Sequence, residues 1–166
     1  MKYPIELESL YDSRFLNHEF VEEYIKNVEG GETLLSIYKK LSVKEKKIIK
    51  CRIHGELNHR NVLSAENQLC IIDWGQSKHN YLALELNNSS YNTKSAYLKF
   101  IKRAEIDCDK IYSYEEQLFL AKYIEMNRAI HNGIVRKRLT HQLSIWVQKE
   151  IQRLLKIGQA LSKGVI

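Results

Sequence analysis

A polar segment that separates apolar runs is the feature that most restricts how this chain can fold. Residues 54–61 read His-Gly-Glu-Leu-Asn-His-Arg-Asn and follow an apolar-rich stretch from Ile48 to Ile53. Val62-Leu63, a polar turn at 64–67 and the apolar run Leu69–Ile72 come next. Two short apolar runs around a polar turn are typical of a β-hairpin. The sequence therefore predicts a loop carried by a buried strand, followed directly by a small hairpin.

Side chains with oxygen atoms lie at both ends of this predicted hairpin. Glu56 and Asn61 precede it, and Asp73 follows it. Two carboxylates and one carboxamide are hard oxygen donors of the kind that Mg²⁺ and phosphoryl-transfer chemistry need. Because buried strands hold their loops rigidly, we expect Glu56, Asn61 and Asp73 to converge on one point.

The arrangement resembles the aminoglycoside phosphotransferase and choline kinase-like family, whose members are distant relatives of the protein kinases. The matching residues are His-Gly-Glu at 54–56, Asn61, Ile-Asp-Trp at 72–74 and the acid in Leu84-Glu85-Leu86. The resemblance implies the helical C-terminal lobe of a protein kinase-like fold, in which a short β-hairpin carries the catalytic and metal loops. It also implies ATP and Mg²⁺ as cofactors and a small molecule with a hydroxyl group as the phosphoryl acceptor.

The same resemblance implies a role for each matching residue. Glu56 stands where the family has its catalytic Asp, so Glu56 and Asn61 are the expected catalytic residues. Asn61 and Asp73 are the expected metal ligands, with Asp73 holding Mg²⁺ against the nucleotide phosphates. Glu85 is expected to brace the catalytic loop from the helix that follows. His54 is interpreted as a structural loop histidine whose imidazole bonds the backbone.

Two of the matching acids are glutamates, which are longer than the aspartates of the family pattern. Glutamate at 56 keeps the charge of aspartate but reaches about one carbon further, and a misplacement of about 1 Å can cost about 10²-fold in rate. Glu85 shows the same lengthening, and the two changes could compensate each other. The alternative to a phosphotransferase is therefore a noncatalytic, pseudokinase-like remnant that binds a ligand or a protein partner. Whether the chain is an enzyme stays open at this point.

We expect no nucleotide-binding lobe within this sequence, because the matching segment begins at residue 54. Gly30-Gly31 follows residues with helical spacing, which favours a helix terminator over a phosphate-binding loop. Ser42 and Glu45 form a capping-box pattern, which predicts a helix that contains Lys44, Lys46 and Lys47. The nucleotide lobe would have to come from a partner chain or from another gene segment.

The rest of the chain is predicted to be helical and to form one domain over residues 1–166. Residues 93–103 have the pattern of one helix, and Ser113 with Glu116 repeats the capping box at the start of a second, which ends near Gly133. The final helix carries an apolar stripe from Leu139 to Leu161 with a period close to 3.6. We therefore expect a mainly α (α+β) fold, with roughly six or seven helices around the hairpin.

The chain is basic, with a formal net charge of +6. Its basic residues are scattered, and the nearest approach to a cluster, Arg136–Arg138 with Lys149, Arg153 and Lys156, is interpreted as a solvated helix face. A nucleic-acid-binding domain would rest on charge alone, so we do not expect nucleic acid as a partner. Acids downstream of the hairpin leave an amine or amino-alcohol acceptor open without identifying a substrate-binding residue; they are Glu105, Asp107, Asp109, Glu115, Glu116 and Glu125.

Cysteine and histidine spacing does not match a zinc site. Cys51, His54, His59 and Cys70 lack a paired second half, and both cysteines are interpreted as core residues. Three cysteines without a disulfide framework are typical of a reducing compartment. The first residues do not form a secretion signal, and no run approaches about 18 apolar residues. We therefore expect a cytoplasmic protein with no membrane partner.

Overall fold

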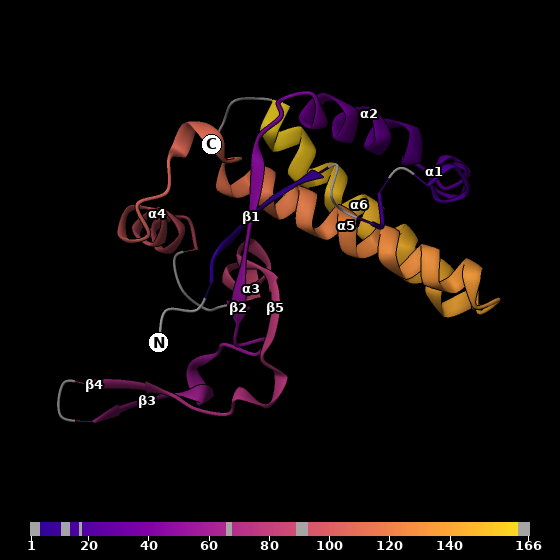
Figure 1. Cartoon of the computed structure of the whole chain (residues 1–166). Coiled ribbons are helices and arrows are strands. Elements are labelled where there is room, and N and C mark those ends of the chain that lie inside the picture. Colours follow the sequence, from indigo (N-terminus) through magenta and orange to yellow (C-terminus); the bar gives the residue numbers. More distant parts are fainter. Residues whose placement is uncertain (1–3, 11–13, 17, 66–67, 89–92, 163–166) are drawn as a thin grey trace. The chain divides into compact units, whose positions relative to one another are not determined.

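The computed structural model describes residues 4–10, 14–16, 18–65, 68–88 and 93–162, and these fall into two compact units (Figure 1). The first, which we name the loop unit, comprises Met1–Glu8 and Lys47–Leu118; the second, the helical unit, comprises Ser9–Lys46 and Phe119–Ile166. The described part of the chain contains six α-helices and two small sheets. The expected mainly α (α+β) composition is thus confirmed.

A three-stranded sheet forms the base of the loop unit, in the order β1 (Glu6–Ser9), β2 (Lys47–Ile53), β5 (Lys78–Tyr81). Strands β2 and β5 are antiparallel, with Ile53 opposite Lys78. From Ile49 to Ile53, buried residues alternate with more exposed ones, as the two-residue period of a strand requires. Strand β2 therefore ends in a buried residue directly before the polar segment 54–61.

A separate two-stranded hairpin follows the polar segment, as the sequence predicts. It consists of β3 (Val62–Ala65) and β4 (Gln68–Ile71), and Val62 lies opposite Ile71. A short 3₁₀ helix, His59–Asn61, precedes the hairpin, and a second, Trp74–Gln76, follows it. Figure 1 shows the hairpin extending from the loop that begins at the end of β2. Two of the predicted site residues thus lie at the ends of the hairpin, Asn61 directly before β3 and Asp73 shortly after β4.

The helices of the loop unit are α3 (Leu82–Asn88), α4 (Thr93–Arg103) and the first turns of α5 (Tyr114–Val135). Ser113 and Glu116 form the predicted capping box, because Glu116 N donates to Ser113 Oγ (3.3 Å) and Ser113 N donates to Glu116 Oε2 (2.9 Å). The helix predicted at 93–103 is confirmed with the same bounds.

A buried hydrogen-bond network connects β2 with these helices. The Gln117 side chain is fully buried; its Oε1 accepts from Ile49 N (3.0 Å), and its Nε2 donates to Tyr112 O (3.1 Å) and to the Tyr97 hydroxyl. The Tyr97 hydroxyl donates to Tyr112 O (2.9 Å). Burial raises the pKa of Tyr97 well above its usual range, so this hydroxyl stays protonated and keeps its donor role. The network fixes the strand that presents the loop.

The helical unit contains α1 (Glu19–Lys26), α2 (Gly31–Ser42), the greater part of α5 and α6 (His141–Ser162). Part of the predicted apolar stripe of the last helix is completely buried, at Val147, Ile151 and Leu154. The rings of Tyr38 on α2 and Tyr123 on α5 stack with centroids 4.5 Å apart. This unit therefore has an apolar core of its own.

Glu150 is the charged residue at the centre of α6. Its side chain is buried, and it forms ion pairs with Lys122 (3.4 Å) and Arg153 (3.2 Å). A buried carboxylate needs such partners because losing its hydration is costly.

The predicted helix start at Ser42 is wrong. Ser42 is the last residue of α2, and its Oγ donates to Lys39 O (2.9 Å), which satisfies a carbonyl at a helix C-terminus. Glu45 has φ 52°, a left-handed conformation that a first helical turn does not allow. The chain turns here and enters β2 at Lys47 instead.

The glycine pair Gly30-Gly31 lies between two helices, since α1 ends at Lys26 and α2 begins at Gly31. Gly30 has φ 82°, a conformation that residues with a Cβ atom adopt rarely. The C-cap of α1 is Asn27 and Gly30 is the N-cap of α2, so the pair starts the second helix and, contrary to the prediction, does not terminate the first. No helix in the described part of the chain is long and apolar enough to cross a membrane.

We expect the Gln117→Met variant to lose at least about 2 kcal/mol in its free energy of unfolding. Methionine fills a similar volume but accepts no hydrogen bond from Ile49 N, and each buried polar group left unpaired costs about 1–3 kcal/mol. Urea denaturation followed by circular dichroism measures the change. The same substitution at the exposed Gln142 on α6 is the control, and equal losses at the two positions would contradict the role of this network.

Candidate functional site

His54 connects the two segments that carry the predicted site residues. Its side chain is 3% exposed, its Nε2 lies 2.7 Å from Ile72 O, and its Nδ1 lies 3.3 Å from Glu56 N. A backbone N–H can only donate, so Nδ1 accepts and Nε2 carries the hydrogen that is donated to Ile72 O. The neutral Nε2–H tautomer thus links the segment after β2 to the segment before Asp73.

Glu85, on α3, supports the same loop from a second direction. Gly55 N donates to Glu85 Oε2 at 2.9 Å, and the Glu85 side chain is buried. The other oxygen, Oε1, is buried without a hydrogen-bond partner among the described residues. Burial raises the pKa of the neighbouring Cys51 thiol to about 11, and the negative charge of Glu85 adds to this shift. Through Oε2, the Glu85 carboxylate binds the backbone of the loop at Gly55.

Gly55 is required by the local geometry. Its φ is 93°, and a Cβ atom at this position would lie 2.4 Å from Gln76 O. Both the backbone conformation and the contact exclude a side chain. The polar segment consequently approaches the backbone that follows Asp73 more closely than any other residue type would permit.

Asn61 is oriented by its amide group. Its Nδ2 donates to Glu56 O at 2.9 Å, and because a carbonyl only accepts, the amide nitrogen must be the atom that faces Glu56. The Asn61 Oδ1 therefore points elsewhere, and no hydrogen-bond partner for it occurs in the described part of the chain. This oxygen is available to a cation.

Asp73 lies at the same end of the hairpin as Asn61. Ile72 N donates to Asn61 O at 3.0 Å, which holds the residue before Asp73 against Asn61. Asp73 has φ 60° and ψ 60°, a left-handed conformation that costs a residue other than glycine about 1–3 kcal/mol and often occurs at functional sites. The structure thus brings Asn61 and Asp73 together through the backbone, with the Asp73 side chain exposed to solvent.

The Glu56 side chain is the least fixed of the predicted site residues. Its backbone is held on both sides, since Glu56 N donates to His54 and Glu56 O accepts from Asn61 and from Asn58 Nδ2 (3.0 Å). Its carboxylate is exposed and makes no hydrogen bond or ion pair with the described residues. The loop geometry therefore places the Glu56 backbone without locking the carboxylate.

Asn58 is a loop residue whose role the sequence analysis did not identify. Its Oδ1 accepts from Arg60 N (2.9 Å) and caps the 3₁₀ helix His59–Asn61, while its Nδ2 joins Asn61 in donating to Glu56 O. An asparagine whose side chain can accept from the backbone N–H two residues later, here Asn58 with Arg60, is a signal in the sequence that could have identified this cap.

The donor set suits Mg²⁺ with few protein ligands. Asn61 Oδ1 and the Asp73 carboxylate are hard oxygen donors, and Mg²⁺ is often bound by one or two carboxylates together with substrate phosphates and water. Among the described residues, no group of three His, Cys, Asp or Glu side chains could hold a metal ion. Asn61 and Asp73 could therefore hold Mg²⁺ together with phosphate oxygens and water as further ligands.

Large apolar side chains remain exposed on the hairpin and directly after it. Leu69 is 74% exposed, and Trp74 is 46% exposed although its ring lies 4.9 Å from that of His54. The other exposed members are Leu63, Ile71 and Ile72. The prediction that Cys70 is a core residue is wrong, because Cys70 is exposed on the two-stranded hairpin; for Cys51 the same prediction is confirmed.

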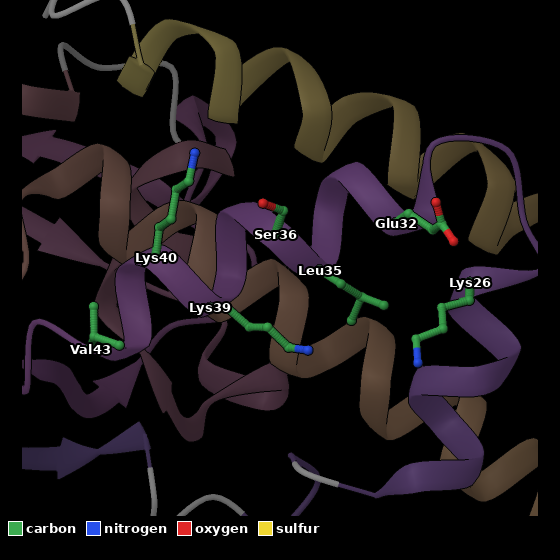
Figure 2. Close-up of a pocket in the computed structure, with 7 residues that line it drawn as sticks. All are labelled: Lys26, Glu32, Leu35, Ser36, Lys39, Lys40 and Val43. Atoms are coloured by element: carbon green, nitrogen blue, oxygen red, sulfur yellow. The ribbon is translucent and has the colours of Figure 1, made fainter.

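A shallow hollow of about 540 Å³ lies elsewhere, along α2 in the helical unit (Figure 2). Its lining is Lys26, Glu32, Leu35, Ser36, Lys39, Lys40 and Val43. Figure 2 shows Lys26 and Lys39 pointing toward each other past Leu35. No predicted site residue lines this hollow, so the candidate site is defined by the contacts of the loop unit.

Comparisons of the sequence with protein-family models and with curated proteins give no match.

We expect the Gly55→Ala variant to be destabilised by about 1–3 kcal/mol, because alanine strains a left-handed backbone position and its Cβ would collide with Gln76 O. Thermal and urea unfolding measure the loss. Gly75→Ala is the matched control, since a Cβ there would meet only Asp73 Oδ1, at an ordinary 3.4 Å. A Gly55→Ala protein as stable as the control would contradict the described loop conformation.

Cys51 should make stability depend on pH in the alkaline range. Its thiol has a folded-state pKa of about 11, raised by burial from the ordinary value of 9.0, so the unfolded chain loses this proton first as the pH rises. The stabilisation is complete below pH 9 and is lost as the pH rises toward 11. We therefore expect the stability difference between wild type and Cys51→Ala to shrink across this range in urea titrations. A difference that is constant with pH would show that the thiol is not shielded as described.

Proposed function

We propose that this chain is the C-terminal, catalytic lobe of an ATP-dependent phosphotransferase similar to the aminoglycoside phosphotransferase and choline kinase-like family, acting on a hydroxyl group of a small molecule. The observation that carries the proposal is the connection made by His54, whose ring bonds both the Glu56 segment and the Asp73 segment. It supports the proposal because phosphoryl transfer depends mainly on the positioning of metal ligands and a base.

Each residue has a distinct task in this proposal. Bound Mg²⁺ would neutralise charge on the nucleotide phosphates. Asn61, with its amide nitrogen held by Glu56 O, would present Oδ1 to the cation, and Asp73 would supply the carboxylate. Glu56 orients the acceptor hydroxyl or takes its proton. Glu85 and His54 position the loop backbone and do not touch substrate.

A nucleotide-binding lobe, from a partner chain or from another segment of the gene product, would complete the site. The exposed apolar side chains on and beside the hairpin support this part of the proposal, because clustered exposed apolar residues commonly mark interaction surfaces. Leu69 and Trp74 are the members that such a lobe would cover.

A noncatalytic binding module is the second candidate, and the Glu56 side chain favours it. The carboxylate is exposed, has no partner that fixes it within the described part, and carries one more rotatable bond than aspartate. Such a side chain is poorly prepared for a reaction that depends on position. In this case the loop would bind a ligand or a protein without transferring phosphate.

Binding and catalysis can be tested separately. If the chain holds Mg²⁺ and phosphates as proposed, Mg-ATP should raise the melting temperature of the wild-type chain, and Asp73→Asn should abolish the shift because a carboxylate ligand is lost. Glu56→Gln, the control, should keep it. Absence of any Mg-dependent shift by ATP in the wild type would favour the noncatalytic candidate.

With a complementary nucleotide lobe added in trans, we expect ATP-dependent phosphorylation of hydroxyl acceptors. Glu56→Gln should slow this reaction by about 10²–10⁴-fold if Glu56 acts as the base. Asp73→Asn should abolish it. Turnover that Glu56→Gln leaves unchanged would remove Glu56 from the mechanism.

A further inference from the structure

Charge is distributed unevenly along the last quarter of the chain. After Glu125 the sequence contains eight basic residues and a single acidic one, Glu150. Glu150 is buried and its carboxylate already binds Lys122 and Arg153. The solvent-facing side of α6 therefore presents no carboxylate.

Five of the exposed residues of α6 form one stripe along the helix. Gln142, Trp146, Lys149, Arg153 and Lys156 are all exposed, and their spacing alternates between four and three residues. This spacing keeps side chains on one side of a helix and is the spacing by which two helices pack along a shared seam. The buried residues Val147, Ile151 and Leu154 occupy a different side of α6. We name the five exposed residues the α6 seam.

The two ends of this seam differ in chemistry. At the N-terminal end, Trp146 is 38% exposed and the adjacent Ile145 is 40% exposed. Leu139, in the turn before the helix, is also exposed, so part of the apolar stripe predicted from the sequence remains uncovered. At the other end lie Lys149 and Lys156, neither of which has an ion pair with another described residue.

We propose that the α6 seam docks an acidic amphipathic helix of a partner protein. Apolar residues of that helix cover Ile145 and Trp146, and carboxylates spaced by four and three residues face Lys149, Arg153 and Lys156. Buried tryptophan and arginine side chains are the residue types that contribute most to protein–protein interfaces. From Gln142 to Lys156 the seam extends about 21 Å, a length that suits a partner helix of about four turns.

The charge and shape of the seam favour this occupant over other polyanions. A nucleic-acid backbone would pair with the lysines but would leave Ile145 and Leu139 in water. A helix laid along α6 engages both ends of the seam. Because a single helix pair buries little area, the complex should be weak and transient.

The probe is a synthetic helical peptide of about 18 residues with leucines in its first turns and glutamates at alternating four- and three-residue spacing in the rest. The chain has two tryptophans, so Trp74→Phe leaves Trp146 as the sole tryptophan, whose emission is excited selectively at wavelengths where tyrosine does not absorb. We expect a saturable blue shift of its emission, with a dissociation constant in the micromolar range. A peptide of the same composition with its glutamates spread around the helix should bind at least about tenfold more weakly.

Charge variants locate the interaction. The double variant Lys149→Glu, Lys156→Glu should weaken binding by about tenfold or more. Lys99→Glu with Lys102→Glu, on an exposed face of α4, changes the net charge equally and should leave binding unchanged. Anionic vesicles of phosphatidylcholine and phosphatidylserine, and duplex DNA, are titrated in parallel.

Two results would overturn the proposal. One is the absence of a blue shift, or equal binding of the two peptides, which would show that the seam does not recognise a helical pattern of carboxylates. The other is a stronger shift with vesicles or DNA that is lost in the Lys149→Glu, Lys156→Glu variant, which would assign the seam to that occupant. Circular dichroism of the variants confirms that they are folded.

Discussion

The imidazole of His54 is the interaction on which the geometry of the loop unit depends. Both of its nitrogens bind backbone groups, one as donor to Ile72 O and one as acceptor from Glu56 N. A protonated ring would have no lone pair on Nδ1 and could not accept from Glu56 N. A phenylalanine of similar shape could make neither bond. One buried, neutral side chain thus connects the loop to the segment before Asp73, although the two are far apart in the sequence.

Unusual backbone conformations on both sides of this bridge show how the surroundings determine the loop. Gly55 and Asp73 both have positive φ angles, 93° and 60°. Glycine adopts such an angle without strain, whereas at Asp73 the conformation is costly and persists only where neighbouring contacts hold it. Glu85 supplies one such contact, through Gly55 N, and the Ile72–Asn61 backbone bond supplies another beside Asp73.

Local patterns predicted the elements whose stability is decided locally. The hairpin follows from two apolar runs around a polar turn, and the start of α5 follows from Ser113 and Glu116, which bind each other's backbone as a capping box does. The same pattern failed at Ser42 and Glu45, because Ser42 bonds backward to Lys39 O and closes a helix instead.

Elements that depend on distant partners could not be predicted in this way. Strands β1 and β5 are short and carry charged residues; β5 is paired with β2, and β1 lies beside β2 in the sheet order. The exposure of Cys70 depends on whether anything covers the hairpin, which no local pattern contains. The orientation of Asn61 likewise depends on a carbonyl five residues away and not on its neighbours in the sequence.

The two glutamates that the sequence analysis singled out for their length, Glu56 and Glu85, have different surroundings in the structure. The Glu85 carboxylate accepts a hydrogen bond of 2.9 Å from the backbone nitrogen of Gly55, and the Glu85 side chain is buried. The extra carbon of this glutamate therefore fits between α3 and the loop. Within the described part of the chain Glu85 makes no hydrogen bond to the Glu56 side chain, so its effect on Glu56 passes through Gly55 N and the loop backbone. The extra carbon of Glu56 ends in an exposed carboxylate instead. Under the proposed function, the reach of this side chain bears directly on whether the loop transfers phosphate or only binds a ligand, because the hydrogen bonds that hold the Glu56 backbone leave its carboxylate unfixed.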